Sequence, residues 1–237
     1  MTPGPVLGID TTTPLGGVAV VGEEGVLAAY AADVHGSHSP RLMAAVEKLL
    51  ADAGLRPGDL AGIGVSIGPG SFTGLRVGVA TAMGLARAAD LPLYPVPTLE
   101  VVAQGAPRAD GEVVAVAMIA RRDEVYGACF EPRGDGWNPL LAPRALAPGA
   151  FLADLCALEV PCLLAGTGSA MVIGDGPAPK SVRVADPVFA RPRVELVAWR
   201  ARAMHAAGEP VVAADLAPRY LKASQAEIAW QARQSGA

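Results

Sequence analysis

The chain has 237 residues, of which 51% are hydrophobic and 18% charged, and its formal net charge is −4. This composition excludes an intrinsically disordered chain, and the length allows one large domain or two small lobes. Because the chain shows no signal-peptide pattern and no apolar run of about 18 residues, we expect a cytoplasmic protein that does not span a membrane.

The predicted elements of the first hundred residues alternate in a regular way. Short apolar runs separated by turn residues predict strands over 6–10, 18–21 and 26–33. Apolar residues at helical spacing predict helices over 39–53, 75–89 and 98–104, and buried strands over 61–67 and 93–96 lie between them. Three strands followed by helix, strand, helix and strand is the order of a ribonuclease-H-like lobe.

The pattern breaks near 105–111, where Pro107 and polar residues indicate a lobe boundary. We therefore expect an N-terminal lobe over 1–105 and a C-terminal lobe over 106–237. In the second lobe the sequence predicts strands over 113–120 and 124–130, a turn-rich stretch over 134–148, a helix over 150–158 and a strand over 162–165. A later helix over 194–207 can pack back on the first lobe, and the tail over 218–222 is extended.

Glycine is frequent between residues 68 and 78, where a predicted strand leads into a helix. The segment lacks the Lys-Ser/Thr ending of a P-loop and does not match G-x-G-x-x-G. Free amides at a helix N-terminus suit an anion. The favoured interpretation is structural: Gly68 and Gly70 make a tight turn, and Gly74 and Gly78 let the helix lie close to the sheet.

Asp10-Thr11-Thr12-Thr13 follows the first predicted strand and is similar to the phosphate and metal loop of actin-like kinases. An Asp-Thr turn is more often ordinary turn chemistry. The rival function is an actin-like small-molecule kinase or ATPase that uses Asp10 and the Gly68–Gly74 turn, with 165–169 as the nearest second loop. The candidate phosphate-loop residues are Asp10, Thr11, Gly68 and Gly70.

Metal chemistry has little support in the sequence. His35 and His38 are neighbours, but no H-E-x-x-H motif exists, which argues against a zinc hydrolase. The three cysteines form no C-x-x-C pair, and we interpret them as reduced and structural. The arginines at 121–122 and at 191, 193, 200 and 202 are interpreted as solvated charges, so we expect no nucleic acid to bind this chain strongly by itself.

Four segments together resemble the TsaB (YeaZ) family: 8–13 (GIDTTT), 38–42 (HSPRL), 68–78 (GPGSFTGLRVG) and 120–126 (ARRDEVY). The resemblance implies a two-lobed α/β fold of the actin-like (ASKHA, ribonuclease-H-like) class. It implies a mixed five-stranded sheet in the first lobe and a smaller, degenerate second lobe. It also implies a non-catalytic subunit that pairs with the catalytic subunit TsaD and, through it, with the ATPase TsaE. That complex transfers threonylcarbamoyl to a tRNA adenosine beside the anticodon, and tRNA would be reached only through the complex.

The catalytic relative carries two histidine metal ligands in a segment similar to residues 96–102 of this chain. Thr98 and Val102 stand where those ligands would be, and a valine side chain cannot bind a metal. We therefore expect no metal and no cofactor on this subunit alone.

The expected partner surface is the helix over 39–53, with help from the helix after Gly74. Leu42, Val46, Leu49 and Ala53 form a stripe toward the sheet, while Met43 and Leu50, beside Glu47, are expected to face outward. The alternative is that these residues widen the core contact. A homodimeric binding module is a further possibility. The predicted interface residues are Met43, Val46, Glu47, Leu50, Arg76 and Met83.

Overall fold

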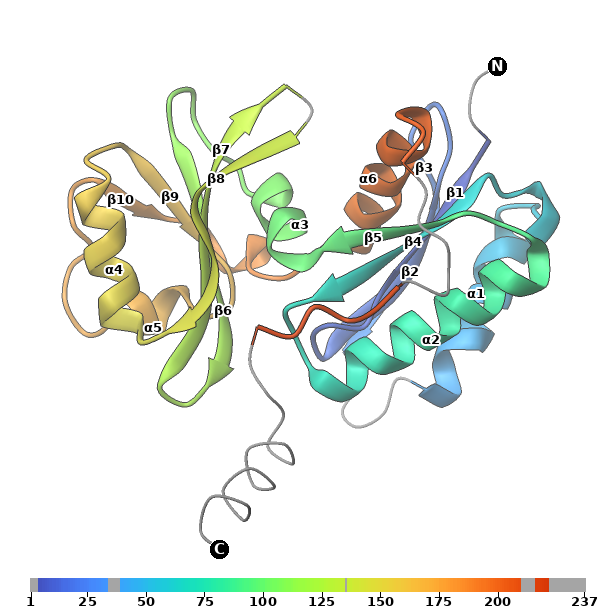
Figure 1. Ribbon diagram of the computed structural model, residues 1–237, viewed down its shortest axis with the longest axis horizontal. Helices are drawn as coiled ribbons and strands as arrows, with labels where there is room; N and C mark the ends of the chain where they lie inside the picture. The colour runs from blue at the N-terminus through green and yellow to red at the C-terminus, as the bar shows by residue number, and fades with distance from the viewer. Residues whose placement is uncertain (1–3, 34–38, 135, 210–215, 222–237) are drawn as a thin grey trace, which may run out of the picture.

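The computed structural model describes residues 4–33, 39–134, 136–209 and 216–221 and has two lobes (Figure 1). The sheet of the first lobe has the strand order β3-β2-β1-β4-β5. β1 pairs antiparallel with β2 and parallel with β4, so the sheet is mixed. Its strands are β1 (Val6–Asp10), β2 (Leu15–Val21), β3 (Val26–Asp33), β4 (Gly62–Gly68) and β5 (Leu93–Pro97).

The sheet of the second lobe repeats this arrangement. Its order is β10-β9-β6-β7-β8, with β6 antiparallel to β7 and parallel to β9. β6 therefore takes the place that β1 has in the first lobe. The strands are β6 (Val113–Arg121), β7 (Glu124–Arg133), β8 (Gly136–Leu146), β9 (Cys162–Ala165) and β10 (Val182–Val184). The two described sheets have the same number of strands. The second lobe is smaller in the lengths of β9, β10 and its helices.

Helices cover both faces of the first sheet (Figure 1). α1 (Ser39–Asp52) and α2 (Phe72–Ala89) pack on one face, and α6 (Val194–Ala206) packs on the other, mainly against β1, β2 and β4. A Cβ at Gly8 would lie 2.6 Å from the Ala198 nitrogen, and one at Gly64 would lie 2.4 Å from the Ala201 Cβ. These two glycines let α6 approach the sheet closely.

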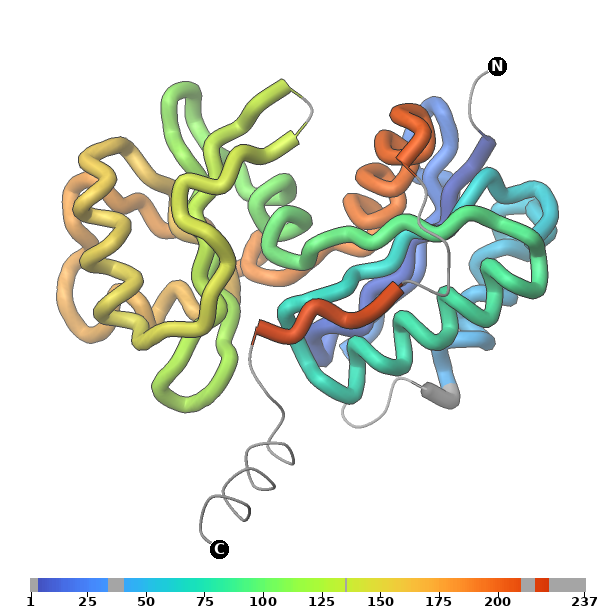
Figure 2. The backbone as a smooth tube through the Cα atoms, viewed as in Figure 1, coloured from blue at the N-terminus to red at the C-terminus, as the bar shows by residue number. Residues whose placement is uncertain are grey.

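The chain passes to the second lobe through α3 (Thr98–Gly105) and returns before α6 (Figure 2). Helix α6 therefore packs on the first lobe although it follows the second lobe in the sequence. Helices α4 (Pro148–Ala157) and α5 (Ser169–Ile173) belong to the second lobe, and two 3₁₀ turns lie at Pro57–Asp59 and Pro187–Phe189.

The stretch over 134–148 is not turn-rich as predicted, because most of it forms strand β8. Pro139 pairs with Phe130, and the register shifts on either side of Cys129. β8 is an edge strand, and prolines are tolerated at sheet edges and bulges. Helix α5 and strand β10 were not predicted, because they have 5 and 3 residues, too few to show a periodicity.

All three cysteines are free thiols, and Cys129 and Cys162 are buried in the second lobe. A hydrogen bond with Cys162, together with burial, raises the pKa of Cys129. His35 and His38 lie outside the described residues. Over the described part of the chain, no helix has the length and apolar run needed to cross a bilayer.

Candidate functional site

Two loops meet at one edge of the first sheet. β1 and β4 are parallel neighbours, so the loops that follow them leave the sheet at the same edge. The Thr11 hydroxyl donates to the Gly74 carbonyl at 2.7 Å, and the Ser71 amide donates to the Thr12 carbonyl at 2.7 Å. The fold thereby brings together the four predicted phosphate-loop residues, Asp10, Thr11, Gly68 and Gly70.

The Asp10 carboxylate binds its own loop. Its Oδ1 accepts hydrogen bonds from the Thr12 amide and the Thr12 hydroxyl, each at 2.9 Å, and its Oδ2 accepts one from the Ser66 hydroxyl on β4. The side chain is only 1% exposed. An aspartate that accepts from the backbone two residues on is the usual chemistry of an Asx turn. Asp10 therefore fixes the loop after β1 and links it to β4.

The glycines of the second loop are needed because the first loop packs directly on them. A Cβ at Gly74 would lie 1.9 Å from the Thr11 carbonyl oxygen, and a Cβ at Gly70 would lie 2.6 Å from the Thr12 Cβ. At the start of α2, the Ser71 hydroxyl accepts from the Gly74 amide at 3.2 Å and caps the helix. Thr11 and Thr12 thus fill the space beside Gly70 and Gly74.

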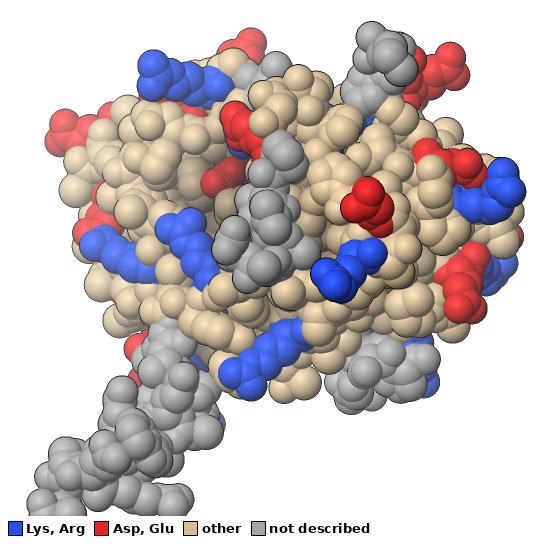
Figure 3. Space-filling model, turned by 45° about the vertical axis from the view of Figure 1, so that its right-hand side comes forward, with Lys and Arg blue, Asp and Glu red and all other residues tan. Residues whose placement is uncertain are grey.

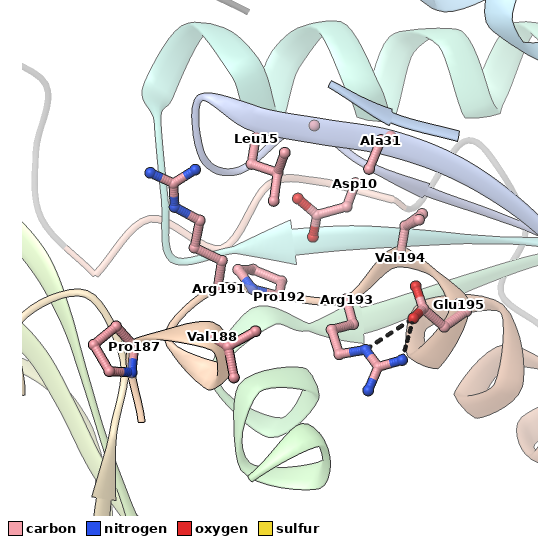
Figure 4. A pocket seen from close by; sticks show the side chains of 12 residues that line it. Asp10, Leu15, Ala31, Pro187, Val188, Arg191, Pro192, Arg193, Val194 and Glu195 are labelled. Carbon is pink, nitrogen blue, oxygen red and sulfur yellow. Dashed lines mark hydrogen bonds and ion pairs between the residues drawn. The ribbon is translucent and has the colours of Figure 1, made fainter. Parts of the chain in front are cut away.

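A cavity of about 460 Å³ opens beside these loops, between the β1–β2 turn and the start of α6 (Figure 4). Figure 4 shows the Asp10 carboxylate at its edge, with Arg191 and Arg193 on the facing segment. Arg191 forms an ion pair with Asp33 at 3.1 Å, and Arg193 forms one with Glu195 at 2.6 Å. Both arginines are therefore already neutralised by carboxylates of the same chain.

The turn after β9 in the second lobe corresponds to the turn after β4 in the first lobe. It also packs against its own sheet. A Cβ at Gly166 would lie 2.1 Å from the Ala117 carbonyl oxygen, and that oxygen accepts from the Gly168 amide at 2.8 Å. The Ile119 amide donates to the Thr167 hydroxyl at 3.1 Å. The backbone of β6 therefore packs directly against the turn over 165–169, which was the candidate for a second phosphate loop.

The described part of the C-terminal tail lies beside the end of β4, a position that the sequence did not predict. The Arg219 amide donates to the Ile67 carbonyl at 2.7 Å, and the rings of Tyr220 and Phe72 lie 4.9 Å apart. A larger cavity of about 780 Å³ separates the lobes here, and the tail forms part of its wall. The extended Pro-Arg-Tyr-Leu segment was a signal for an ordered tail, but it carried no information about its contacts.

Thr98 and Val102, the two positions expected to lack metal ligands, have structural roles. The Thr98 hydroxyl is fully buried and accepts from the Gly68 amide at 3.1 Å. Val102 is 1% exposed and packs in the second-lobe core. Among the residues whose structure is described, no group of three or more His, Cys, Asp or Glu side chains is arranged to hold a metal ion.

The prediction that Leu50 faces outward is wrong. Leu50 is 5% exposed and Val46 is 2% exposed, and both lie in the core of the first lobe. Helix α1 contacts β2, β3 and α2, so it buries a wider face than a single stripe. Met43, at 41% exposure, and the exposed Glu47 remain on the outer surface.

Helix α2 contributes a second exposed surface next to α1. Arg76 is exposed, with its guanidinium carbon 4.0 Å from the Phe72 ring centroid and its Nε donating to the Tyr220 hydroxyl at 3.1 Å. Met83 is half-buried and packs partly against the first-lobe core. Ala80, Gly84 and Ala88, at four-residue spacing, are exposed and small. This surface leaves room for another helix to approach closely.

Charges of both signs are interspersed on the face of the molecule in Figure 3. On that face the Lys and Arg side chains form no continuous basic stripe of the kind that tracks a phosphate backbone.

Two lobes with sheets of the same mixed order, and helices on both faces of the first, define a two-lobed actin-like protein. Known proteins agree with this class. A protein titled YeaZ from Pseudomonas aeruginosa has a TM-score of 0.78 and 30% identity, covering 92% of this chain and 100% of that chain. The family model described as TsaD: tRNA N6-adenosine threonylcarbamoyltransferase matches residues 27–155.

Sequence relatives give the family. The tRNA threonylcarbamoyladenosine biosynthesis protein TsaB of Bacillus subtilis is 30% identical over 95% of this chain and 97% of its own length. The Escherichia coli protein of the same name is 34% identical over 69% of this chain and 71% of its own length. The chain belongs to the TsaB (YeaZ) family, as the motifs over 8–13 and 68–78 indicated.

Proposed function

We propose that this chain acts in threonylcarbamoyladenosine biosynthesis as a non-catalytic, activating subunit in the cytoplasm. It pairs with a TsaD-like catalytic subunit and reaches the TsaE-like ATPase and the tRNA through that subunit. Membership in the TsaB family supports the pathway. The observation that supports a role without chemistry is the filled loop pair, in which Thr11 and Thr12 occupy the space at Gly70 and Gly74.

The surface formed by α1 and α2 supports pairing. Met43 is a large apolar side chain left 41% exposed, and the exposed, charged Glu47 lies one helical turn further on. An apolar residue rimmed by charge is typical of a protein-binding surface. The exposed Ala80 and Gly84 on α2 would let a partner helix pack at short range. A homodimer through the same surface would compete with the TsaD-like partner.

Reconstitution tests the proposal directly. The TsaD-like subunit, the TsaE-like ATPase, tRNA, ATP and the threonylcarbamoyl donor are combined with and without this chain, and modified adenosine is quantified. We expect product only when the chain is present, and we expect it to co-elute with the TsaD-like subunit. Full activity without the chain would contradict an activating role, and failure to co-elute would contradict pairing.

We expect Asp10→Asn to leave this activation intact. The asparagine oxygen still accepts from the Thr12 amide, and loss of a charged hydrogen-bond acceptor lowers the free energy of unfolding by about 2 kcal/mol. A kinase or ATPase that used Asp10 for metal or phosphate would instead lose nearly all activity. Thermal unfolding measures the loss of stability, and the reconstituted assay measures whether activation is retained. Loss of activation by a folded Asp10→Asn protein that still pairs would place Asp10 in the chemistry.

A further inference from the structure

A third cavity, of about 500 Å³, is lined by residues of α3, α6 and the hairpin of β7 and β8. Figure 1 shows how these elements are arranged. The cavity is separate from the loops after β1 and β4 and from the α1–α2 surface. One wall is the outer face of α6, the opposite wall is the hairpin, and the end of α3 closes one side. Its volume is in the range of small-ligand sites.

Two indoles and three guanidinium groups line this cavity. Trp199 on α6 is 42% exposed, and Trp137 on β8 is half-buried, with its ring centroid 6.2 Å from that of Phe130. Arg108, Arg200 and Arg202 contribute the positive charge. Among the described lining residues there is no carboxylate.

Arg200 has an acidic neighbour. Glu100 lies 3.8 Å from Arg200, and burial raises the pKa of Glu100 although the Arg200 charge opposes that shift. The Arg202 Nε is buried and has no hydrogen-bond partner among the described residues. Arg202 also lines the cavity, so its positive charge lies beside any ligand bound there.

We propose that this cavity binds a nucleotide unit of single-stranded RNA, with the base on Trp199 and the phosphate on the arginines. Trp199 and Arg202 are three residues apart on α6, so their side chains lie on the same face. Ala203 and Ala206 beside them are small and leave space for a ring. Stacking on an aromatic side chain combined with cations for the backbone is how proteins bind single strands.

The size of the contact agrees with a role inside a larger complex. One stacked base and one or two phosphate contacts give weak binding, so this chain alone would not hold tRNA tightly. The cavity can instead orient a strand that a partner also holds. Identifying the RNA as tRNA rests on the proposed function. The proposal that the cavity binds a nucleotide does not rest on it.

Fluorescence anisotropy of a labelled ten-nucleotide single-stranded RNA, added to the isolated full chain at low salt, tests the inference. We expect Trp199→Leu to weaken binding about 5- to 100-fold. We expect Arg202→Gln to weaken it and to lower the salt slope by about 0.7. Arg56→Gln, which removes the same charge from a side chain that is 88% exposed on the first lobe, should leave the affinity unchanged. Circular dichroism checks that each variant is folded.

Competition identifies the source of the nucleotide. Displacement of the RNA by millimolar AMP supports a site that takes free mononucleotides, and retention of the RNA supports a site that needs a strand. RNA binding that folded Trp199→Leu and Arg202→Gln proteins retain in full overturns the proposal. So does polyglutamate binding with the same dependence on Trp199, because it would identify an acidic protein as the ligand. Since no partner subunit is present, this result is independent of the reconstitution described above.

Discussion

Replacing Gly64 with alanine should lower the free energy of unfolding by about 3 kcal/mol. The added Cβ would lie 2.4 Å from the Ala201 Cβ and 3.0 Å from the Val197 carbonyl oxygen, both on α6. Neither atom is the flexible end of a long side chain, so the whole helix must shift to relieve the contact. Because α6 covers β1, β2 and β4, a shift disturbs packing along the centre of the sheet.

Urea unfolding followed by circular dichroism measures the effect, and Gly84→Ala is the matched control. Gly84 lies inside α2, and a Cβ there would meet nothing within 4 Å. Alanine favours a helix over glycine by about 1 kcal/mol, so the control should be equally or more stable. A Gly64→Ala protein as stable as the unchanged chain would show that α6 does not pack against β4 as described.

The first lobe was predictable because its elements are long and clearly bounded. The helix from residue 72 to 89 has apolar residues at regular spacing, a serine cap at its start and a left-handed Asp90 at its end. The position of Asp10 and Gly68 at one edge of the sheet follows from the strands they end, because β1 and β4 are parallel neighbours. Strand order within such a lobe is limited to few arrangements.

The parts that sequence reasoning missed depend on contacts between distant residues. β8 contains Pro139 and Pro143 and is a strand only because it pairs with the edge of β7. The nucleotide cavity needs Trp137, Trp199 and Arg202, which come from two lobes and share no motif. The spacing of α1 left Leu50 between two faces, and its burial in the first-lobe core became clear only from the tertiary structure, in which α1 packs on β2, β3 and α2.

Because Leu50 is buried and Met43 is exposed, substitutions in α1 can test folding and pairing separately. Leu50→Glu should lower the free energy of unfolding by about 4 kcal/mol, because the carboxylate would enter the core without a partner. Met43→Glu changes a side chain that is 41% exposed, so the stability of the isolated chain should change by less than about 0.5 kcal/mol. Thermal and urea unfolding measure both values.

Pairing should show the opposite pattern for Met43. If α1 and α2 bind the TsaD-like subunit, a carboxylate at residue 43 would be desolvated at the interface, and affinity should fall about 100-fold or more by calorimetry. Leu140→Glu is the matched control, because Leu140 is 38% exposed on the edge strand of the other lobe. The control should pair normally. A folded Met43→Glu protein that binds the partner as tightly as the control would exclude α1 from the interface, and a stable Leu50→Glu protein would contradict the packing of that helix.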